Sequence, residues 1–316
     1  MKNILVLFLL LSIIASANFV QKVTQTHIRS LNTILFFASE DIISSGHFRF
    51  KSYDIDLDNY FFPFSFPFKS AYQNFDYYVN GSIGFSNYKQ KNINLHRGTK
   101  DSYNLHNYAF KLGVGIQYYT SKDTDLKLGA SYNYSLLDGT YKSKKKLNSL
   151  DPDDKVINTL LNNTQHYHTV ELSSAFTYHP YLYDYKPYSN ISIRHFSTHL
   201  TKEITSRSVI KSTIVKLKVG LVTPTVSEVF GLSLTLEPYA SALYVYGDIE
   251  NTLDLNTIYV LGNTFRLNAY PVTCWVEDFA SFQRDSMNWI REITFDLNVV
   301  KGHNFKGFNV GLGLKF

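Results

Sequence analysis

The sequence predicts an all-β chain that folds as a transmembrane up-and-down antiparallel β-barrel of about twelve strands, with a short N-terminal helix. Three observations point to this fold class. The chain begins with a segment typical of a secretory signal, most of its length alternates between apolar and polar residues, and its last strand ends on an aromatic residue.

The amino terminus has the pattern of a secretory signal peptide. Lys2 is followed by the apolar run Ile4–Ile14 and by three small residues at positions 15–17. Such a segment is removed on export, so residues 1–17 are expected to be the signal peptide and Asn18 the first mature residue. The run is too short to span a bilayer as a helix, and no later window offers about eighteen apolar residues. A helical membrane protein is therefore excluded.

The composition of this 316-residue chain favours a membrane barrel. Tyr and Phe number 24 each, and charged residues make up 18% of the chain, below the usual quarter. A water-soluble β-sandwich could alternate in the same way, but its strands are usually shorter. Cys274 is the only cysteine, so no intramolecular disulfide can form and the closed backbone ladder is expected to supply the stability. The modest net charge of +5, together with export, argues against a nucleic-acid partner.

Residues 18–45 differ from the rest of the chain. Apolar residues and one histidine recur there at helical spacing, with polar residues between them. The spacing predicts an amphipathic helix, or plug segment, ahead of a barrel that occupies residues 46–316; a disordered mature terminus is the alternative. The stripe consists of Val20, Val23, His27, Leu31, Ile34 and Leu35.

Twelve alternating stretches follow, and most are ten or more residues long, as tilted membrane strands require. Long connections are expected at one end of the barrel and short turns at the other. The exception is 271–289, where apolar residues have helical spacing, so that either a helix lies there or the strand count is wrong by two. The predicted strands are 47–56, 60–69, 75–87, 104–119, 124–136, 166–179, 187–198, 209–222, 229–246, 257–270, 290–300 and 306–316.

The last strand is apolar on one face and small or polar on the other. It resembles the closing strand of a bacterial outer-membrane β-barrel, a family in which the terminal aromatic residue belongs to the signal read by the barrel-assembly machinery. The resemblance implies the cell outer membrane as location, and that machinery, outer-membrane lipids and lipopolysaccharide as partners. The residues of the implied insertion signal are Phe308, Val310, Leu312, Leu314 and Phe316.

About twelve strands, a helix before the first strand and a terminal Phe are similar to the translocator barrel of autotransporters. In that family the helix lies inside the barrel, and a passenger is exported through the pore. Only about thirty residues separate the expected cleavage site from the first strand, too few for a folded passenger. The match is therefore to a solitary, passenger-less barrel. The lysines of loop 137–165, if extracellular, could meet lipopolysaccharide phosphates, although a solvated loop is the simpler interpretation.

The face expected to line the lumen carries charges of both signs. These charges could line a narrow aqueous pore, or they could pair and hold a closed barrel rigid. The sequence thus predicts a narrow pore or a structural or interaction protein of the envelope. The expected lumen-lining residues are Lys111, Lys127, Glu171, Arg194, Lys216, Lys218, Glu237, Arg266, Glu292 and Asp296.

An enzymatic alternative rests on His195 and Ser197. Two residues apart on one strand, they share the lipid-facing side, which resembles the His-x-Ser pair of outer-membrane phospholipase A and the lipid A deacylases. Thr198 stands where those families usually have Asn, and the nearest acid is Glu203 in the following loop. The chain is therefore expected to be a non-enzymatic barrel. No cofactor and no metal site is expected, because no three or four ligands converge in the sequence.

Overall fold

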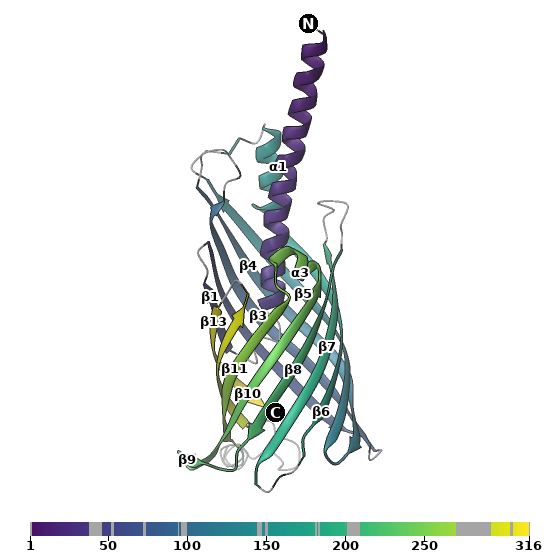
Figure 1. The fold of residues 1–316 in the computed structure, drawn as a ribbon, viewed down its shortest axis with the longest axis vertical. Coiled ribbons are helices and arrows are strands. Elements are labelled where there is room, and N and C mark those ends of the chain that lie inside the picture. Colours follow the sequence, from purple (N-terminus) through teal and green to yellow (C-terminus); the bar gives the residue numbers. More distant parts are fainter. Residues whose placement is uncertain are drawn as a thin grey trace, which may run out of the picture.

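Twelve of thirteen antiparallel strands close into a barrel that holds a long amino-terminal helix (Figure 1). The computed structural model describes residues 2–37, 46–51, 54–71, 74–93, 95, 100–143, 147–148, 151–180, 182, 184–200, 209–269, 292–303 and 306–315. The elements are α1 (Lys2–Phe37), β1 (Gly46–Lys51), β2 (Ile55–Lys69), β3 (Phe75–Ile93), β4 (Asp101–Ser121), β5 (Thr124–Lys142), α2 (Pro152–Leu160), β6 (Thr164–Tyr178), β7 (Lys186–Leu200), β8 (Val209–Val222), β9 (Ser227–Val229), β10 (Leu232–Gly247), α3 (Asp248–Leu253), β11 (Thr257–Asn268), β12 (Glu292–Gly302) and β13 (Lys306–Lys315).

The barrel closes because β1 pairs with β2 on one side and with β13 on the other. Each remaining strand pairs with its neighbours along the chain, except that β8 pairs with β10 across the three-residue β9, which pairs with β10 alone. The predicted fold class, an up-and-down barrel of twelve strands with an amino-terminal helix, is confirmed. Below, the loop end is the end that carries α2 and α3, and the turn end is the opposite one.

Side chains alternate strictly between the two faces of the wall. On β4 the outward Tyr108, Phe110, Leu112 and Val114 are 49–61% exposed, whereas inward Lys111 is buried. Apolar side chains outside and polar ones inside are the arrangement of a barrel surrounded by lipid. Within the part of the chain that the structure describes, no helix is both long and apolar enough to cross a membrane.

Helix α1 enters the barrel from the loop end, where α2 and α3 also lie (Figure 1). It runs without interruption from Lys2 to Phe37, so the expected signal segment 1–17 continues directly into the predicted plug segment. The signal cleavage stays a prediction. Residues 38–45, the end of that plug segment, lie outside the described residues.

The first strand is shorter than predicted, and the prediction of 47–56 was wrong in its second half. β1 ends at Lys51, and the chain reverses so that Arg49 stands opposite Asp58. On the outward face, Arg49 forms ion pairs at 3.4 Å with Asp56 and 3.6 Å with Asp58. These cross-strand charge pairs favour the observed register, in which Asp56 and Asp58 belong to β2.

Several other strands run farther toward the loop end than predicted. The prediction ended two of them at 87 and 136, but β3 reaches Ile93 and β5 reaches Lys142. Here the strands extend beyond the belt of apolar side chains that surrounds the outside of the barrel, called the outward apolar belt below. Polar residues occupy their outward face. The hydrophobic alternation fades while the backbone ladder continues, for example in the pair Ser102–Lys142. Loop 137–165 is correspondingly shorter and contains α2.

Two prolines lie on the β1 side of β2, beyond the last described pair of the β1–β2 ladder. The Lys91 backbone N–H donates to the Asp54 carbonyl, so even-numbered β2 residues bond to β3 and odd-numbered ones face β1. The β1–β2 ladder begins at the pair Gly46–Phe61. The next odd-numbered positions include Pro63 and Pro67, which have no N–H to donate.

Glycines on the inner face make room for aromatic rings of the neighbouring strand. A Cβ at Gly115 would overlap the Tyr78 ring and the Leu128 carbonyl, and the same ring lies over Gly129. Tyr188 covers Gly220 and Tyr239 covers Gly262 in the same way, because a Cβ at either glycine would come within 2.6 Å of the ring. Rings on the inner wall thus occupy the space above glycines of neighbouring strands. The predicted helix at 271–289, Cys274 and Phe316 lie outside the described residues.

Candidate functional site in the barrel lumen

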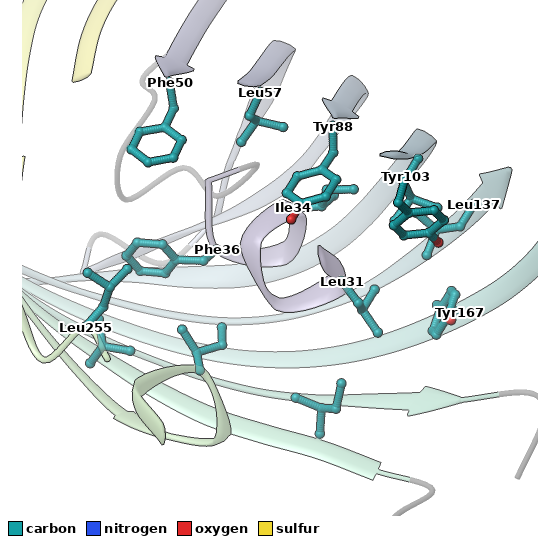
Figure 2. Close-up of a cluster of buried hydrophobic side chains, with 14 of the residues drawn as sticks. Leu31, Ile34, Phe36, Phe50, Leu57, Tyr88, Tyr103, Leu137, Tyr167 and Leu255 are labelled. Atoms are coloured by element: carbon teal, nitrogen blue, oxygen red, sulfur yellow. The ribbon is translucent and has the colours of Figure 1, made fainter. Parts of the chain in front are cut away.

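The carboxyl-terminal half of α1, residues 18–37, is here called the plug helix, and its last turns are buried on every side. Leu31 and Ile34 are 1% exposed and pack into a hydrophobic cluster formed with the barrel wall. Figure 2 shows both side chains projecting from the helix toward a ring of wall residues, among them Tyr88 and Tyr103. Residues of the predicted stripe therefore face the wall, with Val20 and Leu35 only half-buried.

A buried histidine joins the plug helix to the wall on the loop-end side of this hydrophobic cluster. His27 is 1% exposed; its Nε2 lies 2.7 Å from Tyr167 Oη and its Nδ1 lies 3.3 Å from Tyr103 Oη. Tyr167 donates its hydroxyl hydrogen to Gln165 Oε1 at 2.5 Å, so it accepts from His27 Nε2–H. Nδ1 is then left to accept from Tyr103. Gln165 in turn donates to the Leu160 carbonyl at the end of α2.

Burial keeps the His27 ring neutral. Desolvation lowers the pKa of His27 from its ordinary 6.5 to about 4, and the nearby Gln165 side chain opposes this shift only in part. The ring lies beyond the outward apolar belt, because the outward neighbours at its level include His166 and His168 on β6 and Asn104 on β4.

Three buried polar residues of the plug helix donate hydrogen bonds within the protein. Ser30 Oγ and Thr33 Oγ1 donate to backbone carbonyls four residues earlier, at 2.7 and 2.8 Å. Asn32, fully buried, donates to Thr252 Oγ1 at 3.0 Å and to the Asp248 carbonyl at 3.4 Å, both in α3. The helix is therefore fixed to the rim of the barrel as well as to its wall.

Beneath the plug helix, three charged side chains from three strands form a compact layer. Glu171 accepts from Lys111 Nζ at 2.8 Å and from Arg194 Nη1 at 3.1 Å, and all three side chains are at most 12% exposed. A cavity of only about 50 Å³ separates this layer from Ile34 and Leu35. A larger cavity of about 440 Å³ lies on the other side of the layer, and Lys127, Lys216 and Lys218 are among the residues that line it.

A second group of charges lies on the β10–β12 side of the lumen. Glu237 contacts Arg266 and the Tyr188 hydroxyl and accepts from Lys218 Nζ at 3.2 Å. Arg266 also lies 3.5 Å from Glu292.

The remaining predicted lumen residue, Asp296, is buried and held by neutral donors. Thr264 Oγ1 donates to it at 2.9 Å, and Tyr239 Oη donates to it at 3.2 Å. Asn298 Nδ2 also donates to its second carboxylate oxygen at 2.9 Å. Charges on this side of the lumen are therefore held in hydrogen-bonded clusters.

The His195–Ser197 pair lies on the outward face, but the two side chains do not form a dyad. Among the described residues His195 Nδ1 lies 2.9 Å from Thr213 Oγ1, and no hydrogen bond joins His195 to Ser197. Glu203, the acid that the enzymatic alternative requires, lies outside the described residues. In the predicted insertion signal, Phe308 and Leu312 face outward and are 52% and 61% exposed.

Sequence reasoning missed the partners of His27. The predicted stripe contains His27, yet Tyr103, Gln165 and Tyr167 were assigned no role. A single polar ring within an otherwise apolar helical stripe is the signal that could have found them, because a buried histidine needs hydrogen-bond partners.

Comparison with known proteins shows which solved structures share this fold. No protein-family model and no curated protein matches the chain. Solved structures do match. The translocator domain of the autotransporter NalP from Neisseria meningitidis has a TM-score of 0.52 at 9% identity, over 85% of each chain. The β domain of the Bordetella autotransporter BrkA gives 0.51 at 8% identity, over 84% of this chain and 94% of that one. The transport unit of the autotransporter AIDA-I from Escherichia coli gives 0.54 at 9% identity, over 92% and 98%. The predicted likeness to autotransporter translocator barrels is confirmed for the fold.

Proposed function

We propose that this protein is an integral outer-membrane barrel that is closed at rest by its own plug helix, and that it acts as a structural or interaction protein of the envelope. The observation that carries the proposal is the complete burial of the helix between Ser30 and Ile34 against the barrel wall. An open pore would need a continuous aqueous path, and the buried part of the plug helix interrupts such a path.

Two further features favour a closed barrel over a conducting one. The layer of Lys111, Glu171 and Arg194 lies directly below the helix, with only about 50 Å³ of space between them. Buried ion pairs of this kind need their geometry to be kept, because a buried charge that loses its partner is costly. The helix is also bonded to α3 at the rim through Asn32.

Planar-bilayer conductance tests the closed state. The wild-type protein is expected to insert without conductance steps, whereas Leu31→Asp/Ile34→Asp is expected to produce discrete steps. Two carboxylates in the apolar layer would cost several kcal/mol if buried, so the helix should leave the lumen. Gln21→Asp/Gln25→Asp, which places the same charges on exposed positions of the same helix, is the matched control and should stay silent. Steady conductance of the wild-type protein would contradict the proposal.

Disulfide trapping tests the position of the helix directly. In a Cys274→Ser background, Asn32→Cys/Thr252→Cys replaces two side chains that are in hydrogen-bond contact at 3.0 Å. Oxidation of the intact barrel should link the two cysteines. A pairing of Gln21→Cys with Thr252→Cys should remain reduced, because residue 21 lies three helical turns away and is exposed.

A catalytic role for His195 and Ser197 is not part of this proposal, since the His195 ring bonds to Thr213 instead. Release of fatty acid from phospholipid or lipid A by the purified barrel, abolished by Ser197→Ala, would overturn the non-enzymatic assignment.

A further inference from the structure

One row of side chains forms the loop-end edge of the outward apolar belt on β11, β12 and β13. Leu261, Val299 and Phe308 stand opposite one another in the strand register, with Val299 in the middle. All three point outward and are 52–70% exposed. In the next outward row toward the loop end, β12 and β13 carry lysines, so the apolar belt ends here on these two strands.

The row beyond this edge brings two positive charges together. Lys301 of β12 pairs with Lys306 of β13, and Tyr259 of β11 stands on the other side of Lys301. Both lysines are exposed, and Tyr259 is 59% exposed. The Cβ atoms of directly opposite residues lie about 5 Å apart, and like charges at such positions repel each other. The strand register thus holds two ammonium groups side by side at the border of the lipid-facing surface.

The lysine pair has no carboxylate partner among the residues that the structure describes, because neither Lys301 nor Lys306 forms an ion pair there. On the adjoining β1 and β2, the outward carboxylates of Asp56 and Asp58 bind Arg49 instead, at 3.4 and 3.6 Å. An anion from outside the chain that lay between the two ammonium groups would relieve their repulsion.

We propose that Lys301 and Lys306 bind a phosphate group of lipopolysaccharide, whose acyl chains then lie against the apolar row of Leu261, Val299 and Phe308. This inference rests on the proposed outer-membrane location of the barrel. The two lysines face the surrounding membrane and not the lumen, which favours a lipid over a soluble anion.

The charge of the pair favours a phosphate monoester as the ligand. Such a group, as carried by lipid A, has roughly two negative charges at neutral pH, whereas the diester of a glycerophospholipid has about one. Two ammonium groups match the monoester, and each can donate to its oxygens. The hydroxyl of Tyr259 is a further donor at the same level, and a tyrosine suits the border between acyl chains and headgroups.

Binding of lipid A to the full-length protein in mixed micelles with a zwitterionic detergent, followed by thermophoresis, tests this assignment. Diphosphorylated lipid A is expected to bind saturably. Lys301→Gln and Lys306→Gln should each raise its Kd about fivefold, and the two together about twentyfold. Lys301→Arg/Lys306→Arg keeps both charges and should stay within about twofold of the wild-type Kd. Lys122→Gln/Lys186→Gln removes two exposed charges at the turn end and should leave the Kd unchanged.

Several outcomes would overturn the proposal. They are absence of saturable binding by the wild-type protein, an equal loss of affinity in the loop-end and turn-end variants, and undiminished binding of lipid A from which both phosphates have been removed. Equal affinity for dimyristoylphosphatidylglycerol, a phosphate diester, would also overturn it, because the pair would then accept any anionic lipid. Unheated gel mobility identifies folded barrels, and the single variants decide if the double one does not fold. Separation of inner and outer membranes reports the location of the protein independently, so failure of the proposed location would be seen separately.

Discussion

His27 Nε2, on the plug helix, lies 2.7 Å from the hydroxyl of Tyr167 in the barrel wall. Through this contact the helix joins a chain of hydrogen bonds that passes through Gln165 and ends at the Leu160 carbonyl of α2. One side chain thus connects the inside of the lumen, the wall and the rim.

Acidification is expected to weaken the seating of the plug helix. The pKa of His27 is about 4 in the folded protein and 6.5 in the released helix. Above pH 6.5 both states are neutral and stability is at its full value. Between pH 6.5 and 4 only the released state takes up a proton, so about 3 kcal/mol is lost across this window, with little change below it. Amide hydrogen exchange of α1 at pH 7, 5.5 and 4, corrected for intrinsic rates, measures the loss. His27→Gln, neutral throughout, should flatten the profile; an unchanged profile would assign the effect to other groups.

Tyr167→Phe is expected to destabilise the protein by about 1–3 kcal/mol, because it leaves the buried His27 N–H without an acceptor. Tyr178→Phe removes the same hydroxyl from an outward ring that is 45% exposed and should cost less than about 0.5 kcal/mol. Urea unfolding in detergent micelles, followed by circular dichroism, compares the two. Equal midpoints would show that the hydrogen bond of His27 contributes no net stability.

Glu171→Gln should lower stability by about 3–5 kcal/mol, since Lys111 and Arg194 would both lose their ion pair with this buried carboxylate. The surface change Asp56→Asn breaks an ion pair with Arg49, which is 53% exposed, and should cost less than about 1 kcal/mol. For each variant, the temperature at which the compact band of the folded barrel disappears from the gel measures the loss of stability. The double change Glu171→Gln/Lys111→Gln should recover part of the loss, and a failure to do so would argue against charge as the cause.

Gly115→Ala should hinder folding, because the added Cβ would overlap the Tyr78 ring and the Leu128 carbonyl. Overpacking of this kind costs about 1–3 kcal/mol. Gly84→Ala is the matched control, since its nearest neighbours would lie at 3.7 Å, an ordinary contact distance. The yield of folded barrel after dilution from urea should fall for the first change only. If Tyr78→Ala restores the yield of Gly115→Ala, the ring is the cause.

The alternation of single strands was enough to predict the barrel. Lys127 and Leu128 were placed on opposite faces because side chains on a strand alternate whatever the neighbouring strand is. Contacts between side chains of different strands could not be predicted in this way. Glu171 reaches Lys111 and Arg194 from three different strands, and their levels depend on the stagger between neighbours, which no single strand encodes.

The plug helix was predicted for a similar local reason, from the helical spacing of Val23, His27 and Leu31. Its depth in the lumen and its rotation depend on contacts with α3 and the wall, hence on residues more than 200 positions away, such as Thr252. These long-range contacts leave no local pattern in the sequence.

Among the described residues, the joint between β1 and β13 has the fewest residue pairs of any in the barrel wall. The short strand β1 meets β13 over four residue pairs, from His47–Val310 to Phe50–Gly307, whereas β3 and β4 pair along nearly their whole length. A strand from a second molecule that displaced so short a partner would build a mixed sheet. Pro63 and Pro67 withhold two donors along the adjoining edge of β2, which makes this edge a poor template for an incoming strand. The two prolines beside this joint therefore disfavour strand exchange between neighbouring copies.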